Sequence, residues 1–250
     1  MIELKKLSTL PPEDGLSKEE MKVAVEKMKQ RLAELQDMLY AQHQFSVLVI
    51  VQGMDASGKD GLINHAFSGM NPAGIRVYSW KKPTETETKY DFLWRIHQAV
   101  PPKGMIHVFN RSQYEDILVP SVYKTLPETE IEKRYDMMNH FECLLTDSGT
   151  VVLKLYLHVS KKEQQSRMKD RMNQLSKQWK YDPADVGAIK LHDHFLAVYQ
   201  SIFERCERYA PWHIVPSDKN TYKEYLTVKL LLEAMEKLPL AYPKIAKSKK

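Results

Sequence analysis

Residues 47–61 read VLVIVQGMDASGKDG, and this stretch decides the fold. Its first five residues are aliphatic without a polar break, a pattern typical of a strand buried on both faces of a parallel sheet. Residues 53–61 then fit the G-x-x-x-x-G-K pattern of a Walker A phosphate-binding loop. Because the loop directly follows a buried strand and opens a helix over about 60–69, the stretch predicts a strand–loop–helix phosphate site.

The residue types of this loop explain how it would bind phosphate. Its glycines let backbone N–H groups converge on phosphate oxygens, and the following helix contributes the positive end of its dipole. Lys59 supplies a positive charge to the transferred or bridging phosphate. An ordinary strand–turn–helix junction with an exposed lysine is the alternative. We expect phosphate contacts from Gly53, Ala56, Ser57, Gly58, Lys59, Asp60 and Gly61.

Two carboxylates in the loop indicate a metal ion. Asp55 lies within the loop, and Asp60 stands where Ser or Thr normally ligates Mg²⁺. A carboxylate beside bound phosphate would repel it unless a cation lies between them. We therefore predict that Asp55 binds Mg²⁺, with Mn²⁺ as an alternative, through the oxygen ligation that these ions prefer. Asp60 is either a second ligand or a cap of the helix N-terminus.

Strand patterns alternate with helical patterns along the chain. Such alternation predicts a parallel sheet covered on both faces, a three-layered α/β architecture. No boundary divides the sequence, so we predict a single domain over residues 1–250. We expect strands over 47–51, 75–80, 105–109, 151–159 and 212–215, and helices over about 17–41, 60–69, 88–99, 128–147, 161–178, 188–208 and 220–237.

The N-terminal helix, about 17–41, begins with a recognisable cap. Ser17 and Glu20 have the spacing of a capping box. One stripe of this helical extension is apolar, and it is too short for a coiled coil of three to four heptads. We therefore expect it to dock on the domain's own sheet rather than on a second subunit. The stripe consists of Met21, Val25, Met28, Leu32, Leu35 and Leu39.

A second motif, NRSQYED at residues 110–116, follows the strand over 105–109. Ligands of open α/β sheets lie at the carboxyl ends of strands, so this motif and the phosphate loop should face one crevice. Arg111 suits bidentate phosphate contact. Asn110 occupies a strand end where an acid often orients metal or water, and Glu115 and Asp116 are acids that could support the site. The alternative is a helix start capped by Ser112, whose early acids favour the helix dipole.

Positive charge is concentrated in residues 160–182, which contain seven Lys or Arg but only three Asp or Glu. Arg167 and Arg171 are four residues apart and share a helix face. A basic helix after the strand over 151–159 predicts a mobile lid that closes over phosphates and excludes water; a solvated charged helix is the alternative. Lys162, Lys177 and Lys180 belong to the predicted lid, and Lys81 and Lys82 extend the positive charge at another strand end.

Composition limits the class of protein. The chain has 250 residues, 43% hydrophobic and 28% charged, and a net charge of +5, as in an ordinary globular protein. Two cysteines cannot build a disulfide framework, and no apolar run reaches the ~18 residues of a membrane span. We expect a soluble cytoplasmic protein that binds neither a membrane nor nucleic acid. The four lysines of residues 244–250 are interpreted as a solvated end.

Taken together, these segments resemble the polyphosphate kinase 2 family over nearly the whole chain. The resemblance implies a thymidylate-kinase-like P-loop kinase fold with a central parallel sheet and a helical lid. In that pattern Asp55 and Lys59 match the essential acid and lysine of the phosphate loop, Arg111 matches the arginine of the second motif, and Arg167 and Arg171 match the lid arginines. The matching segments are GMDASGKDG, WKKPTETE, YDFLWRIHQAVPPKG, IHVFNRSQYEDILVPSVY, SKKEQQSRMKDR and KQWKYDPAD.

The resemblance also implies an activity. Members transfer the terminal phosphoryl group of inorganic polyphosphate to a nucleotide, reversibly and with Mg²⁺, and assemble as homo-oligomers. Asn110 with Tyr114–Asp116 is similar to the class III subgroup, which accepts both nucleoside mono- and diphosphates, AMP and ADP or GMP and GDP. We expect direct transfer from polyphosphate to the acceptor phosphate between two Mg²⁺ ions, without a phosphoenzyme. Two alternatives are an ATP-dependent nucleoside monophosphate kinase on the same fold and a non-catalytic protein that binds nucleic acid through residues 160–182.

Overall fold

The computed structural model describes residues 3–179, 187 and 189–244 of the chain. The strands are β1 (Ser46–Gly53), β2 (Ile75–Ser79), β3 (Ile106–Asn110), β4 (Thr150–His158) and β5 (Trp212–Pro216). The α-helices are α1 (Lys18–Gln42), α2 (Lys59–Ala66), α3 (Trp94–His97), α4 (Glu115–Tyr123), α5 (Glu128–Asp147), α6 (Lys161–Asn173), α7 (Leu175–Gln178), α9 (His192–Arg205) and α10 (Asn220–Glu236). Short 3-10 turns are η1 (Leu4–Lys6), η2 (Pro72–Gly74) and η3 (Glu87–Lys89).

The five strands form one parallel sheet in the order β2-β3-β1-β4-β5, with β1 at its centre. Every residue of β1 is buried, which explains its unbroken aliphatic sequence. Alternate residues of β1 face opposite cores: Leu48 and Ile50 pack with one, and Val47, Val49 and Val51 with the other. The predicted three-layered α/β fold is confirmed.

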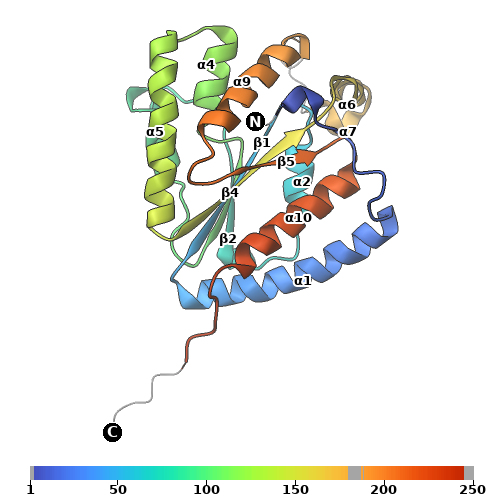
Figure 1. Cartoon of the computed structure of the whole chain (residues 1–250), viewed down its shortest axis with the longest axis vertical. Helices are drawn as coiled ribbons and strands as arrows, with labels where there is room; N and C mark the ends of the chain where they lie inside the picture. The colour runs from blue at the N-terminus through green and yellow to red at the C-terminus, as the bar shows by residue number, and fades with distance from the viewer. Residues whose placement is uncertain (1–2, 180–186, 188, 245–250) are drawn as a thin grey trace.

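Helices cover both faces of the sheet (Figure 1). The core that includes Leu48 is completed by apolar side chains of α4, α5 and α9. The core that includes Val49 is completed by those of α1, α2 and α10. Among the described residues, no helix combines the length and apolarity that crossing a bilayer requires.

The N-terminal helix α1 docks on the domain's own core, as its apolar stripe predicts. The capping box is present: the Ser17 hydroxyl accepts from the Glu20 N–H at 3.3 Å, and the Glu20 carboxylate accepts from the Ser17 N–H at 2.8 Å. Val25, Leu32 and Leu39 are buried in the core that includes Val49 of β1, and α1 reaches that core by packing along α10.

The helix expected over 88–99 is wrong for most of its length. Only Trp94–His97 is α-helical, and Tyr90 has extended backbone angles. The Asp91 carboxylate accepts from the Leu93 N–H at 2.9 Å, and such a local bond competes with helix formation. The helix expected over 161–178 divides into α6 and α7, because Gln174 is extended between them.

Helix α4 realises the alternative of a helix start at the second motif, although its N-cap is Tyr114 rather than Ser112, and it contains Pro120. A proline lacks the N–H that would bond the carbonyl four residues earlier, here that of Asp116. The Arg134 side chain of α5 donates to this carbonyl instead. A long-range contact therefore replaces the missing helical bond, and sequence periodicity does not reveal it.

Candidate active site

Three neighbouring strand ends bring the predicted motifs together. The phosphate loop follows β1, the second motif follows β3, and the basic helix α6 follows β4. Since β3 and β4 flank β1 in the sheet, all three segments meet at its carboxyl edge. This is where open α/β sheets bind ligands.

The phosphate loop turns sharply into α2. Gly58 is the N-cap of α2 and has a left-handed backbone with φ 93°, which favours glycine. Ala56 also has positive φ, at 60°. Gly61 lies within α2, and apart from its chain neighbours and the backbone of its own helix no described atom lies within 4 Å of a Cβ built on it. The conformational requirement for glycine therefore falls on Gly58 rather than on Gly61.

Lys59 is buried beneath the loop. Its ammonium donates to the carbonyls of Gly53 at 2.6 Å and Met54 at 3.1 Å. Burial, followed by the nearby charge of Arg111, lowers the pKa of Lys59 to about 8, and the Asp55 carboxylate partly offsets this. The lysine thus remains largely cationic at neutral pH and spans the base of the loop.

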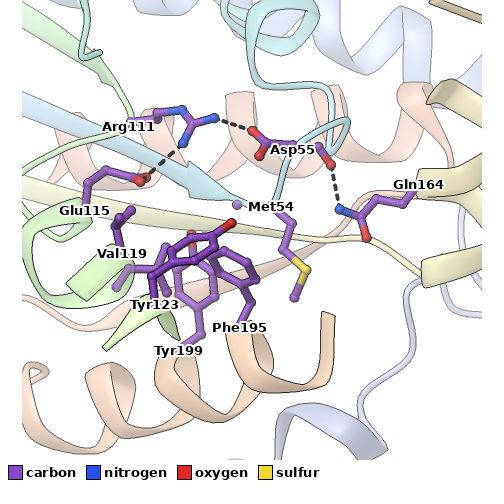
Figure 2. A pocket seen from close by; sticks show the side chains of 11 residues that line it. Met54, Asp55, Arg111, Glu115, Val119, Tyr123, Gln164, Phe195 and Tyr199 are labelled. Atoms are coloured by element: carbon purple, nitrogen blue, oxygen red, sulfur yellow. Dashed lines mark hydrogen bonds and ion pairs between the residues drawn. The ribbon is translucent and has the colours of Figure 1, made fainter. Parts of the chain in front are cut away.

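Arg111 joins the second motif to the phosphate loop (Figure 2). Its guanidinium forms ion pairs with Asp55 and, at 3.2 Å, with Glu115. Its backbone is left-handed, with φ 67°, while its N–H donates to the Val51 carbonyl at 3.0 Å. Burial acts to lower the pKa of Arg111, but Glu115 and Asp55 raise it overall, so the guanidinium stays charged.

Asp60 and Asn110 form a second link between the same two segments. The Asn110 amide donates to the Asp60 carboxylate at 2.8 Å. Asp60 is exposed in the first turn of α2, whereas the N-cap position belongs to Gly58. A negative charge in a first turn favours the helix dipole.

The carboxylates of this site suit a divalent cation shared with phosphate. Within the described residues, no group of three or more His, Cys, Asp or Glu side chains could hold a metal by itself. Mg²⁺ in phosphoryl-transfer sites is bound by one or two carboxylates together with substrate phosphates. Asp55 and Asp60 fit this donor set, and the buried Glu115 Oε1 atom has no hydrogen-bond partner among the described residues.

Asp116 is directed to a different part of the molecule from Glu115. Its carboxylate lies 3.8 Å from Arg95 of α3 and 3.8 Å from Arg134 of α5. Burial raises the pKa of Asp116 to about 6, although both arginines act to lower it. Asp116 therefore ties helices together, while Glu115 contacts Arg111 of the site.

The predicted lid lies against the phosphate loop. The Arg167 guanidinium donates to the carbonyls of Ser57 at 2.8 Å and of Ser217, after β5, at 2.7 Å. Arg171 is half-buried one turn further along α6. Lys162 and Lys177 are exposed, as are Lys81 and Lys82 after β2, and Lys180 lies outside the described residues.

A cleft of about 180 Å³ adjoins the loop. Charged side chains line one end of it, and the other end is apolar and aromatic (Figure 2). The charged end comprises Asp55, Arg111 and Glu115, and the apolar end comprises Leu118, Val119, Tyr123, Phe195 and Tyr199. A phosphate-bearing ligand with a flat apolar group matches this division.

Comparison with known proteins agrees with the motifs and their geometry. The family model described as polyphosphate kinase 2 matches residues 15–241. The chain belongs to the polyphosphate kinase 2 family. It is therefore a phosphotransferase enzyme, and the resemblance inferred from the sequence is confirmed.

Relatives of this polyphosphate kinase 2 protein span most of its length. It is 44% identical over 217 residues to an AMP/ADP-polyphosphate phosphotransferase of Meiothermus ruber, covering 86% of this chain and 81% of that protein. It is 36% identical over 240 residues to an ADP-polyphosphate phosphotransferase of Rhodopseudomonas palustris, covering 91% and 83%. The crystal structure of polyphosphate kinase 2 from Arthrobacter aurescens TC1 superposes with a TM-score of 0.95 at 37% identity, covering 99% of this chain and 89% of that one.

Sequence reasoning missed two side chains that contact the phosphate loop of this polyphosphate kinase. Gln164 of α6 donates to the Asp55 carbonyl at 2.7 Å. Lys223 of α10 donates to the Gly58 carbonyl at 3.3 Å, and burial, followed by Arg167, lowers its pKa to about 7. The spacing of Gln164 from Arg167 places both on one helix face and could have indicated the first. Lys223 carries no local signal, because only the packing of α10 brings it to the loop.

Proposed function

We propose that this enzyme transfers the terminal phosphoryl group of inorganic polyphosphate to AMP and ADP, or to GMP and GDP, reversibly and with Mg²⁺. The observation that carries the proposal is the meeting of Lys59, Arg111 and Arg167 at one edge of the sheet. Phosphoryl transfer needs charge neutralisation and in-line positioning more than covalent chemistry. The names of the Meiothermus and Rhodopseudomonas relatives support this choice of substrates.

The cleft supports a nucleotide acceptor. We propose that the acceptor phosphates face Arg111 and Lys59, while the base packs against Tyr123 and Phe195 at the apolar end. Asn110 at the end of β3 supports the assignment of this enzyme to the subgroup that accepts both nucleoside mono- and diphosphates.

The exposed basic residues support an extended polyanionic donor. A polyphosphate chain carries roughly one negative charge per unit, so its site should be a track rather than a closed pocket. We propose that Arg167 and Arg171 bind the phosphates nearest the loop. More distant units would meet Lys81, Lys82, Lys162, Lys177 and Lys180.

Magnesium fits the proposal through the loop carboxylates. Asp55, with Asp60 as a second ligand, would hold Mg²⁺, which supplies charge neutralisation between donor and acceptor phosphates when bound. Asp55 would also orient the attacking acceptor oxygen. Release of Asp55 from Arg111 would leave the guanidinium free to bind the transferring phosphoryl group.

The decisive experiment omits ATP. The protein is incubated with AMP or ADP, Mg²⁺ and long-chain polyphosphate, and nucleotides are separated by chromatography. We expect wild-type protein to form ADP and ATP. The Lys59→Met variant should form neither, whereas Lys27→Met, a change on the exposed face of α1, should form them at the wild-type rate. Absence of product from wild-type protein would reject the proposal, and turnover only with ATP as donor would support an ATP-dependent nucleoside monophosphate kinase instead.

The manner of transfer has its own test. Rapid quenching during turnover with radiolabelled polyphosphate should yield labelled nucleotide and no labelled protein. A phosphoenzyme that forms and decays at the rate of turnover would contradict direct transfer.

We propose that residues 1–250 form one kinase domain, that the enzyme acts in the cytoplasm, and that it assembles as a homo-oligomer. Light scattering coupled to size-exclusion chromatography tests the assembly, and a mass equal to one chain at micromolar concentration would contradict it.

A further inference from the structure

Each carbonyl group of the phosphate loop accepts a hydrogen bond from a side chain. This holds for all six residues from Gly53 to Gly58. The donors come from three parts of the fold: the loop's own lysine, helix α6 and helix α10. The pairs are Lys59 with Gly53 (2.6 Å) and Met54 (3.1 Å), Gln164 with Asp55 (2.7 Å), Arg167 with Ala56 (3.1 Å) and Ser57 (2.8 Å), and Lys223 with Ser57 (3.4 Å) and Gly58 (3.3 Å).

The direction of these carbonyls matters for anion binding. The C=O and N–H of one peptide unit point in opposite directions, so a carbonyl held outward turns the next residue's N–H inward. A loop that binds phosphate through its amides needs this arrangement, because a carbonyl oxygen facing the anion would repel it.

The Asp55–Ala56 peptide is the one whose orientation depends most on a stabilising hydrogen bond. Ala56 has φ 60°, a left-handed conformation that is unfavourable for a residue with a side chain. Rotation of this peptide would return Ala56 to negative φ and turn its N–H away from the site. The Asp55 carbonyl is bound by Gln164 (Figure 2).

Gln164 is itself oriented by His192. Both side chains are buried, with 2% and 6% of their surface exposed. Gln164 Oε1 lies 2.9 Å from His192 Nδ1, at the start of α9. Because the NH₂ end of the amide faces the Asp55 carbonyl, its oxygen faces His192, and His192 Nδ1 must carry the proton.

We propose that Gln164, oriented by the Nδ1–H of His192, is a positioning residue that prevents rotation of the Asp55–Ala56 peptide and so keeps the Ala56 N–H facing the phosphate chain. The proposal rests on the function proposed above, since it assigns that N–H to the polyphosphate donor. It also explains why two segments that follow β4, α6 and α9, meet beside a loop that follows β1.

Four variants test whether the direction of the hydrogen bonds, rather than side-chain packing, fixes the orientation of the Asp55–Ala56 peptide. His192→Asn retains an N–H close to the position of Nδ1. His192→Asp has a side chain of the same size as asparagine but places an acceptor there, which would reverse the orientation of the Gln164 amide. Gln164→Met removes both hydrogen bonds at similar length. Gln165→Met changes the exposed neighbour on α6 and is the matched control.

The readouts are binding of inorganic tripolyphosphate by calorimetry, kcat and KM for polyphosphate, and crystal structures of the variants. We expect Gln164→Met and His192→Asp to weaken tripolyphosphate binding about tenfold, the factor that corresponds to loss of roughly 1.4 kcal/mol. His192→Asn and Gln165→Met should stay within about twofold of wild type. In the Gln164→Met background, His192→Asp should add no further loss.

The crystal structures distinguish the two proposals. A rotated Asp55–Ala56 peptide in Gln164→Met or His192→Asp supports the positioning role whatever the substrate is. An unrotated peptide in both variants, or equal binding by His192→Asn and His192→Asp, overturns it. A rotated peptide in a protein whose wild type shows no polyphosphate turnover would overturn the proposed function alone.

Discussion

Arg111, at the end of β3, forms an ion pair with Asp55 in the loop that follows β1. The two strands are neighbours, with Val51 opposite Asn110, so the motifs meet although they are far apart in sequence. Arg111 also pairs with Glu115 at 3.2 Å. The guanidinium is thus bound by two carboxylates, and an incoming phosphate must compete with them.

Replacing Arg111 by lysine tests the role of its planar guanidinium. Lysine keeps the charge but cannot make paired hydrogen bonds to phosphate. We expect Arg111→Lys to lower kcat about 100-fold or more, with polyphosphate and AMP as substrates. Arg76→Lys, an exposed change in β2, should leave kcat unaltered. A loss confined to KM would indicate that Arg111 only binds substrate.

Two glycines of the loop motif should respond differently to alanine. Gly58 has φ +93°, and a Cβ there would lie 2.4 Å from Lys223 Nζ. We expect Gly58→Ala to lower stability by roughly 1–2 kcal/mol and to impair turnover, because the loop and Lys223 must shift.

Gly61→Ala is the matched control. Gly61 lies in α2 with open space around its Cβ position, so alanine should stabilise the helix by about 0.5–1 kcal/mol and retain turnover. Urea unfolding and the polyphosphate assay measure both variants. Equal losses in the two would show that conformation at Gly58 is not the cause.

A buried ion pair lies beneath the second motif. Lys154 of β4 contacts both carboxylate oxygens of Glu142 in α5, at 2.9 and 2.7 Å, and both side chains are fully buried. Lys154→Met should lower the free energy of unfolding by about 3–5 kcal/mol, because it leaves Glu142 buried without its partner.

The double variant Lys154→Met with Glu142→Leu removes both charges and should recover part of this loss. Chemical denaturation of the wild type and of both variants measures the difference. A double variant less stable than Lys154→Met alone would contradict the explanation.

The raised pKa of Asp116 predicts how the free energy of unfolding depends on pH. Burial raises its pKa from 3.8 to about 6, so between these values the folded state binds more protons than the unfolded state. Stability contributed by this group is therefore present at low pH and is lost as pH rises through this window. Relative to Asp116→Asn, the wild type should lose up to about 3 kcal/mol between pH 4 and 6 and change little above pH 7.

Urea unfolding of the two proteins at several pH values measures this difference. If the wild type instead gains stability over Asp116→Asn as pH rises, the ion pairs with Arg95 and Arg134 outweigh the cost of burial.

Local patterns identified much of the fold and of the site. The unbroken aliphatic run of β1, the glycine-rich loop and the Ser17 capping box each act over a few residues, so they could be interpreted without the structure. The helix expected over 88–99 was wrong for most of its length, and there the Asp91 side chain accepts a hydrogen bond from the Leu93 N–H, a local contact that periodicity does not detect. Asp116 was grouped with Glu115 because they are adjacent in sequence, yet neighbouring helical residues point in different directions.

The sequence by itself determined the strand–loop–helix phosphate site, the three-layered α/β class and the family, since each depends on short segments with fixed spacing. Only the tertiary structure decided what surrounds the loop. Gln164 and Lys223 come from helices that follow β4 and β5, and the order of the strands brings those helices to β1. Their contacts depend on packing between distant segments, and a single sequence carries no local signal for that packing.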